Sequence, residues 1–354
     1  MAKSAMLLVG TKKGLYTMRS DDRRKWSVEG PYGAPAPIHH ASFDPRDQSM
    51  YAAINSTWGG ARIEYSRDLG KTWTASKTPG FPAGSDRTFY QTWHIEPGHA
   101  KTPNVVWAGT EPAALWKSVD RGETWTLNQA LDDQPSRAKW VPGFGGMGLH
   151  SIAIDAVDPK KMQVGISVGG VYTSTDGGAS WVQDNAQSGG PEDRPDVFGC
   201  IHKLLAHPTA TGVRFMRVHQ EVYWRDPGET KWTFRTTGLP TSFGFSAAIH
   251  PHDPKTAWCI PLHDLKRTAV EPGIAVFKTT DRAATWTRND AGLPKGAPLE
   301  SLREAMHNDL FDDVGVYFGT ANGDVYASLD EGKRWERIAQ YLPYVVSVHA
   351  ATLD

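Results

Sequence analysis

Histidines recur at one position of a repeated pattern, a few residues before a turn of the Asp-Pro type. His39, His150 and His202 each open a short β-rich segment that ends in such a turn. Imidazole is the usual ligand of Fe, Cu, Zn or Ni, and it also transfers protons near neutral pH. If these segments surround one opening, the sequence predicts a metal site or an acid–base site there.

Aligning the segments on their turns adds candidates from the other repeats. The equivalent positions are His39, Gln91, His150, His202, Phe245 and Arg303. The predicted catalytic set, which could act by proton transfer or hold a carboxylate through its arginine, is His150, His202, Glu111, Glu304 and Arg303. The predicted ligand-binding set is His39, His40, Trp58, Trp93, His94, Trp140, His219 and His263, whose tryptophans could stack on a sugar or aromatic ring.

The cofactor is left open, with a divalent transition metal as one candidate. His39, His150, His202 and His219 are the predicted metal ligands, with carboxylates as partners. Two alternatives stand beside the metal: binding or catalysis without one, and a purely structural use of histidines bonded to channel waters.

A tryptophan repeat indicates which elements must position these side chains. Seven tryptophans close copies of S/T-x-D-x-G-x-x-W at intervals of about 50 residues: Trp26, Trp73, Trp125, Trp181, Trp232, Trp286 and Trp335. In this pattern the Asp carboxylate can accept backbone N–H groups across a hairpin turn, and Gly supplies a positive φ. The first copy has Arg23 at the Gly position and the sixth has Ala283.

Three β-rich runs precede or surround each turn, and the tryptophan run adds a fourth. Seven four-stranded antiparallel sheets predict an all-β, seven-bladed β-propeller, with residues 1–354 as a single domain. The first repeat lacks an innermost strand, and the run Val345–Thr352 follows the last repeat. We therefore expect the C-terminal strand to pair with the N-terminal blade and close the ring.

The same topology places the long, irregular connections on one face of the ring. They include segments 74–90, 126–148, 182–199 and 261–273, rich in Gly, Pro and aromatic residues. Binding residues concentrate on loops held by a rigid scaffold, so we expect the site at the channel mouth on this face.

The charge balance and apolar content of the chain limit the classes of partner that it is expected to bind. With 38 Lys+Arg against 39 Asp+Glu, no global charge favours nucleic acid or a membrane surface, and no apolar run reaches the ~18 residues that span a bilayer. Cys200 and Cys259 are too few for a disulfide framework, so a cytoplasmic location is expected. A small molecule or glycan is the expected ligand, and a protein partner is the alternative.

All seven repeats resemble bacterial WD40/YVTN/BNR-like (Asp-box) proteins, which are often labelled exo-α-sialidase or glycosyl hydrolase. The segments Gly109–Leu115, Leu149–Ile152, His202-Lys203 and Leu302–Met306 carry the likeness. The resemblance implies a propeller with a site for a carbohydrate-like molecule, with catalysis favoured and an assembly scaffold as the rival.

This sequence departs from the sialidase pattern in three ways. The F/Y-R-I-P segment of sialidases is replaced here by Leu7-Leu-Val-Gly10, and only Arg303 of the aligned set could serve their three-arginine clamp. Sialidase domains also have six blades. Xyloglucanase-type enzymes resemble two such propellers facing each other, and photosystem assembly factors resemble one propeller that acts by binding.

Two further motifs are interpreted as chance matches. Gly143–Gly148 fits G-x-G-x-x-G without a following helix, and Gly165–Gly169 fits G-x-S-x-G without the strand–turn–helix that would expose its serine.

Overall fold

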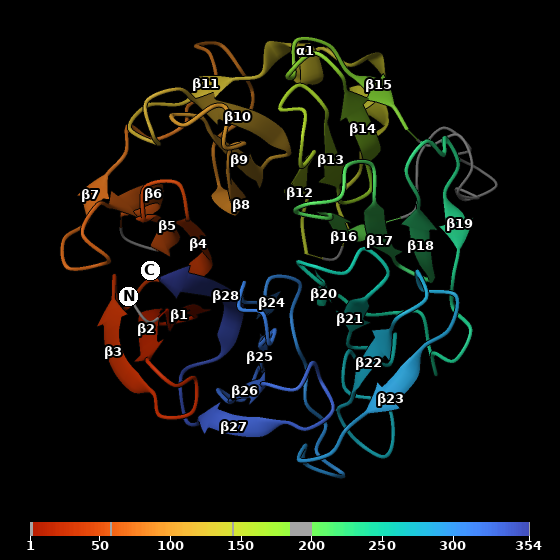
Figure 1. Cartoon of the computed structure of the whole chain (residues 1–354). Helices are drawn as coiled ribbons and strands as arrows, with labels where there is room; N and C mark the ends of the chain where they lie inside the picture. The colour runs from red at the N-terminus through yellow and green to blue at the C-terminus, as the bar shows by residue number, and fades with distance from the viewer. Residues whose placement is uncertain (1–2, 57–58, 144, 185–199, 354) are drawn as a thin grey trace.

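The computed structural model describes residues 3–56, 59–143, 145–184 and 200–353, and it shows seven four-stranded sheets around one axis (Figure 1). Every pairing within these sheets is antiparallel, which confirms the predicted seven-bladed propeller. No helix in the described part of the chain is long and apolar enough to cross a membrane.

Within each blade, the four strands lie side by side, from the innermost at the axis to the outermost at the rim. Blade 1 contains β28 (Val345–Leu353), β1 (Ser4–Thr11), β2 (Gly14–Ser20) and β3 (Ser27–Tyr32). Blade 2 contains β4 (Ile38–Asp44), β5 (Ser49–Ser56), β6 (Gly60–Ser66) and β7 (Thr74–Ala75). Blade 3 contains β8 (Gln91–Pro97), β9 (Val106–Glu111), β10 (Ala114–Ser118) and β11 (Thr126–Leu127). Blade 4 contains β12 (Leu149–Ile154), β13 (Met162–Ile166), β14 (Gly170–Ser174) and β15 (Val182–Gln183).

The remaining three blades follow the same order. Blade 5 contains β16 (Ile201–Ala206), β17 (Arg214–Val218), β18 (Glu221–Arg225) and β19 (Thr233–Phe234). Blade 6 contains β20 (Ala247–Ile249), β21 (Ala257–Cys259), β22 (Val276–Thr279) and β23 (Thr287–Asn289). Blade 7 contains β24 (Met306–Asn308), β25 (Val316–Gly319), β26 (Val325–Ser328) and β27 (Glu336–Ala339). A short α-helix, α1 (Gln129–Asp132), and a 3₁₀ turn, η1 (Pro135–Lys139), lie between blades 3 and 4.

The repeated turns have the chemistry expected from their residues. In blade 2, Asp68 Oδ1 accepts the Thr72 backbone N–H at 2.9 Å, and Ser66 Oγ accepts the Gly70 N–H at 2.8 Å. Gly70 has φ +88°, and Arg23 and Ala283 occupy the same left-handed region in their own copies at 57° and 63°. The copy with Ala283 keeps its geometry without glycine, because the bonds to Thr279 Oγ1 and to the Asp281 carboxylate are retained. In the first copy Asp22 accepts the Arg24 and Lys25 backbone N–H groups instead.

The apolar core lies between adjacent sheets rather than at the axis. One cluster joins blades 6 and 7 through Trp258, Phe318 and Trp335, and another joins blades 1 and 2 through Leu8 and Ile54. Because the sheets pack face to face in this way, the inner edges of seven strands are left to line a central channel.

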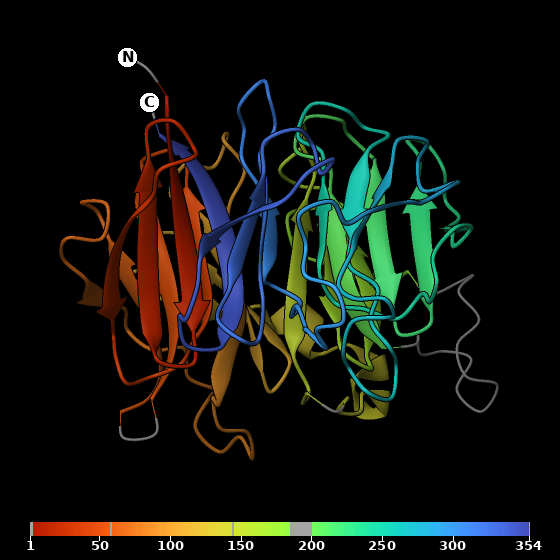
Figure 2. The same cartoon turned by 90° about the horizontal axis from the view of Figure 1, so that it is seen from below.

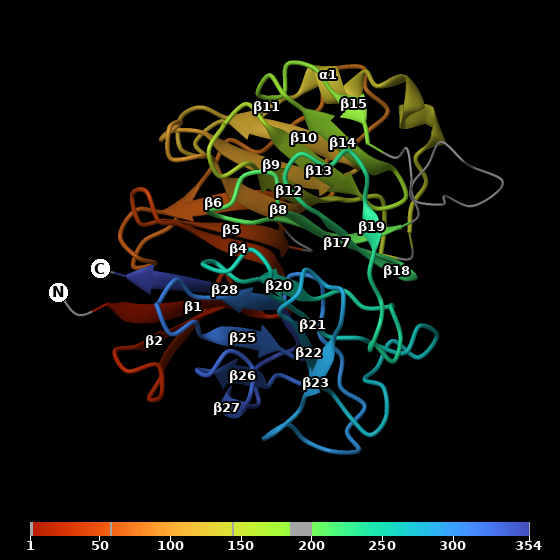
Figure 3. The ribbon, with the colours of Figure 1, turned by 45° about the vertical axis from the view of Figure 1, so that its right-hand side comes forward.

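The C-terminal strand closes the ring as predicted. Strand β28 pairs with β1 from Ser4 opposite Leu353 to Thr11 opposite Val345. It lies between β1 and β4 (Figure 3). The last strand of the chain therefore completes the ring next to strands from its beginning.

The two faces of the ring differ. Viewed from the side (Figure 2), the strands run along the axis and both chain ends lie on one face. Turns such as Asp44–Ser49 connect the two inner strands of a blade on that face. The long connections, including η1, lie on the opposite face, which we call the mouth face.

Candidate functional site

Five of the innermost strands carry a β-bulge at the same level, near the mouth of the channel. Each bulge adds one residue that has no partner on the neighbouring strand, which bends the strand and re-aims that side chain. The unpaired residues are His39, Trp93, His150, His202 and Val346. The predicted equivalence of Gln91 with His39 is therefore wrong by two residues, because the bulge in β8 falls at Trp93.

A cavity of about 560 Å³ opens at the mouth face, and we call it the mouth chamber. Its ionisable and aromatic lining residues are His39, Trp93, Cys200, His202, His219, Phe245, Arg267, Arg303 and Glu304. The bulged residues His39, Trp93, His202 and Val346 therefore line one chamber together with Arg303 and Glu304, and all of these except Val346 are among the predicted site residues.

A second cavity of about 470 Å³ opens toward the face that holds the chain ends, and we call it the rear chamber. His40, His94, Lys203, His307 and His349 line it, and Glu304 lines both chambers. His40 and His94 were expected at the mouth, but each follows a bulged residue and therefore lies one level deeper in the channel.

Glu304 lies at the centre of a buried charge network. Its Oε2 accepts a hydrogen bond from Lys203 Nζ at 2.6 Å, with His94 Nδ1 at 3.5 Å and His40 Nε2 at 3.6 Å. Burial raises the pKa of Glu304, but Lys203 and His94 outweigh burial and hold the pKa well below its usual range. Glu304 Oε1 is buried without a hydrogen-bond partner among the described residues.

The histidines beside Glu304 differ in charge. Burial opposes the charged form of His94, but the Glu304 carboxylate, with Glu96 bonded to Nε2 at 3.0 Å, raises its pKa to about 9. His40 accepts the Ile95 backbone N–H on Nδ1 at 3.1 Å, and burial, with the charge of His94, holds its pKa well below 6.5. The network is therefore one carboxylate facing an ammonium and one imidazolium.

We expect stability to fall as pH rises from about 6.5 to about 9. The folded chain holds a proton on His94 over this range that the unfolded chain releases, so the stabilisation is complete below the unfolded pKa and is lost through the folded one. The expected loss is on the order of 3 kcal/mol, measured as unfolding free energies in urea at several pH values. His94→Gln should flatten this dependence and the exposed control His263→Gln should keep it; a slope unchanged in His94→Gln would refute the assignment.

Arg303 is one of two arginines that line the mouth chamber, beside Arg267. Its Nε donates to the His202 carbonyl, and its guanidinium lies 5.1 Å from the Trp93 ring centre and 5.7 Å from that of Phe245. No carboxylate within the described residues lies at ion-pair distance from Arg303, and its terminal nitrogens have no hydrogen-bond partner there. A guanidinium held in this way is suited to bind an anionic group of a ligand.

A hydrogen bond from the Trp93 indole to Glu111 holds the Trp93 ring in place. Glu111 Oε2 accepts the Trp93 indole N–H at 2.9 Å and the Gln91 amide at 2.7 Å. A Cβ on Gly148 would lie 2.7 Å from Trp93 Nε1, and one on Gly146 would collide with the Glu111 carboxylate. Glycines of the G-x-G-x-x-G match thus leave room for this pair, and Glu111 positions Trp93 instead of lining the chamber.

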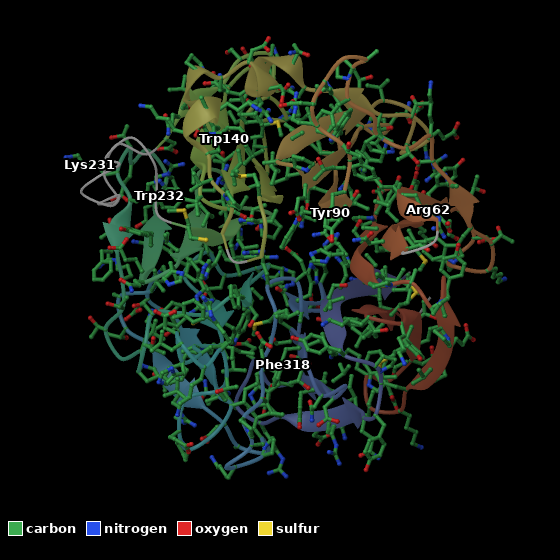
Figure 4. The ribbon with its side chains drawn as sticks, turned by 180° about the vertical axis from the view of Figure 1, so that it is seen from behind. Arg62, Tyr90, Trp140, Lys231, Trp232 and Phe318 are labelled. Carbon is green, nitrogen blue, oxygen red and sulfur yellow. The ribbon has the colours of Figure 1, made fainter. Side chains whose placement is uncertain are left out.

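The other predicted residues lie elsewhere. His150 is fully buried beside Ser151, 3.0 Å from its hydroxyl, and lines neither chamber. Trp140 is buried in a blade core, where it donates to the Tyr172 hydroxyl at 2.8 Å, and it lies toward the rim of the ring (Figure 4). His263 is exposed and accepts the Lys266 N–H, and Trp58 lies outside the described residues.

Two groups within the described residues bring three ligand-type atoms within 4.8 Å of one another. They are Cys200, His202 and His219, and His40, His94 and Glu304. His39 and His150, from the predicted metal set, belong to neither. His39 has its ring edge-on to Trp93, at 4.5 Å between ring centres, and His150 bonds to Ser151.

Sequence reasoning missed Lys203, Cys200 and the stacked pair His307 and His349, whose ring centres are 4.2 Å apart. Lys203 follows His202 just as His40 follows His39, so the two-residue repeat was the signal that could have revealed it.

No family model matches the chain. It is 25% identical over 286 residues to the probable oligoxyloglucan-reducing end-specific xyloglucanase of Neosartorya fischeri, a match that covers 69% of this chain and 33% of that protein. The chain thus spans about a third of the length of this relative.

Solved structures share the fold. An ancestral GH74 enzyme is 14% identical with a TM-score of 0.57, over 86% of this chain and 38% of that one. YCF48 bound to D1 peptide is 18% identical with a TM-score of 0.52, over 86% and 81%. At these identities the structural likeness establishes the propeller and no activity.

Proposed function

We propose that this propeller binds and acts on a carbohydrate-like molecule that carries an acidic group, with the mouth chamber as its site. The observation that carries the proposal is Arg303, a guanidinium enclosed between the rings of Trp93 and Phe245 without a carboxylate partner among the described residues. The similarity to a xyloglucanase supports the carbohydrate part of the proposal.

The mouth chamber could hold a sugar or aromatic ring that carries one charged substituent. Trp93 and Phe245 offer apolar faces for a sugar or aromatic ring, while Arg303 between them would take the carboxylate. Because Glu111 bonds the Trp93 indole, the stacking surface is already in place before a ligand enters.

Two groups in the chamber can transfer protons. Burial lowers the pKa of His39 to about 4, so its imidazole is neutral at pH 7 and can accept a proton. Glu304 is ionised, and its Oε1 has no partner within the described part of the chain. Glycoside hydrolases commonly pair a protonated carboxylic acid with a carboxylate, whereas Glu304 is the one carboxylate among the described lining residues and both it and His39 lack a proton at pH 7, so we assign proton acceptance to these two groups and leave the donation to the leaving group to solvent.

A scaffold function finds less support. The exposed large apolar residues of the described chain, including Val28, Val119, Phe234 and Leu310, are spread over several blades. A partner-binding propeller would present a contiguous apolar patch.

We expect Arg303→Met to weaken the binding of D-glucuronic acid by about 10- to 150-fold, because a charge-assisted bond worth roughly 1.5–3 kcal/mol is lost. Isothermal titration calorimetry with glucuronic acid and with D-glucose measures the effect, and binding of the neutral sugar should change little.

The matched control is Arg282→Met, whose side chain is 49% exposed, and it should bind both sugars like the parent. Equal affinity of parent and Arg303→Met for glucuronic acid would refute the proposed ligand class.

A further inference from the structure

The geometry of blade 5 places a cysteine and two histidines together at the wall of the mouth chamber. Ile201 pairs with Val218, and the His219 backbone N–H donates to the Cys200 carbonyl at 2.9 Å, so Cys200 and His219 face each other across two strands. The bulge after Ile201 turns His202 toward them, with 5.3 Å between the two imidazole ring centres.

Both histidines are oriented by a bond from one ring nitrogen. His202 Nδ1 donates to the Gly244 carbonyl at 2.9 Å, and His219 Nε2 lies 3.2 Å from the Asp264 carboxylate. These bonds leave Nε2 of His202 and Nδ1 of His219 available. A backbone carbonyl or carboxylate on the second nitrogen is the arrangement that metal-bound histidines have in proteins.

We propose that Cys200, His202 and His219 bind one Zn²⁺ ion, with its fourth position open to the mouth chamber. Three ligand atoms within 4.8 Å of one another fit a tetrahedral ion. A thiolate with two imidazoles favours zinc over Mg²⁺ or Ca²⁺, which take oxygen ligands. On binding, the Cys200 thiol gives its proton to solvent and the sulfur bonds the metal.

The charges around the three residues act in opposite directions on an ion. Burial raises the pKa of Cys200, and the guanidiniums of Arg303 and Arg267 act against burial. The Asp264 carboxylate beside His219 offsets part of the positive charge that an ion would add.

The other three-residue group is not suited to a cation. Glu304 Oε2 already accepts from the Lys203 ammonium at 2.6 Å, and His94 beside it carries a proton. A metal there would have to displace two positive charges from one oxygen, so we assign this group to the charge network alone.

The zinc ligands do not include Arg303 or Trp93, so the zinc site and the sugar-binding proposal can be tested separately. The experiment uses the full chain without an affinity tag. Zn²⁺ affinity is measured by competition with a chromophoric chelator, and Co²⁺ is added as a spectroscopic probe. We expect one Zn²⁺ per chain, and a thiolate-to-Co²⁺ charge-transfer band.

Cys200→Ser should remove the charge-transfer band, and Asp264→Asn should weaken Zn²⁺ binding by about 10–100-fold, since it acts through His219. Cys259→Ser, at a fully buried cysteine outside the group, is the matched control and should retain the band. Thermal unfolding of each variant shows that the chain is folded, and Asp264→Asn tests the site at a half-exposed position even if Cys200→Ser unfolds.

A charge-transfer band that persists in Cys200→Ser, or equal Zn²⁺ affinity in the parent and Asp264→Asn, would overturn the proposal. Absence of Zn²⁺ binding by the folded parent chain would overturn it as well.

Discussion

Deleting residues 345–353 should abolish cooperative folding of the whole chain. Val345, Val348 and Ala350 are buried in the cluster between blades 7 and 1, and Ala351 and Leu353 pack on the other side of the same sheet. Burial of each large side chain contributes about 1.5–3 kcal/mol, and the hydrogen bonds of β28 to β1 would be lost as well. That sum is comparable to the total stability of ~5–15 kcal/mol of a typical protein.

The deletion also opens the ring. Without β28, the inner edge of β1 loses its hydrogen-bonded partner, and exposed strand edges promote association between chains. Circular dichroism during heating, with the deleted chain and with the missing segment added as a peptide, measures the effect. We expect no cooperative transition without the peptide and partial recovery with it; an unchanged melting temperature would contradict closure by β28.

Glu304→Gln should destabilise the chain by about 3–5 kcal/mol at pH 7. The substitution keeps the shape of the side chain but leaves the Lys203 ammonium buried without its counter-ion and His94 with Glu96 as its one remaining carboxylate among the described residues. Breaking one partner of a buried pair has this magnitude. Urea denaturation at equilibrium measures the change. Glu96→Gln is the matched control, since the Glu96 side chain is 36% exposed, and it should cost much less.

A double-mutant cycle separates the ion pair from other effects of the substitution. Lys203→Met should also be destabilising, and the double variant should be more stable than the sum of the two single changes implies, because no unpaired charge remains at Glu304 or Lys203. Additive effects of the two substitutions would show that the buried charges do not interact as described.

The fold could be predicted because its signal is repeated and local. Trp73 and its six counterparts mark one turn per blade, and that turn depends on residues close in the chain, such as Ser66 and Asp68. The missing first strand and the spare last run were enough to predict closure by β28.

The site could be predicted only in part, because it depends on the depth of each side chain in the channel. A bulge moves the register by one residue without leaving a mark in the sequence, so Trp93 was assigned by its ring chemistry and not by its position. His40 and His94 were placed with His39 for the same reason, although they lie in the rear chamber.

Partners from other strands and other blades were the second unpredictable part. Nothing in the chain near His219 indicates that Cys200 faces it, since their contact follows from the pairing of β16 with β17. Likewise, Lys203 and Glu304 are 101 residues apart and meet only when the ring has formed.

The most direct test of the central claim is to locate a ligand in the crystal. A crystal of the full chain soaked in D-glucuronic acid should show the sugar in the mouth chamber, with its carboxylate on Arg303 and its ring on Trp93 or Phe245. Density for the sugar in the rear chamber or on the outer strands, with an empty mouth chamber, would contradict the assignment of the site.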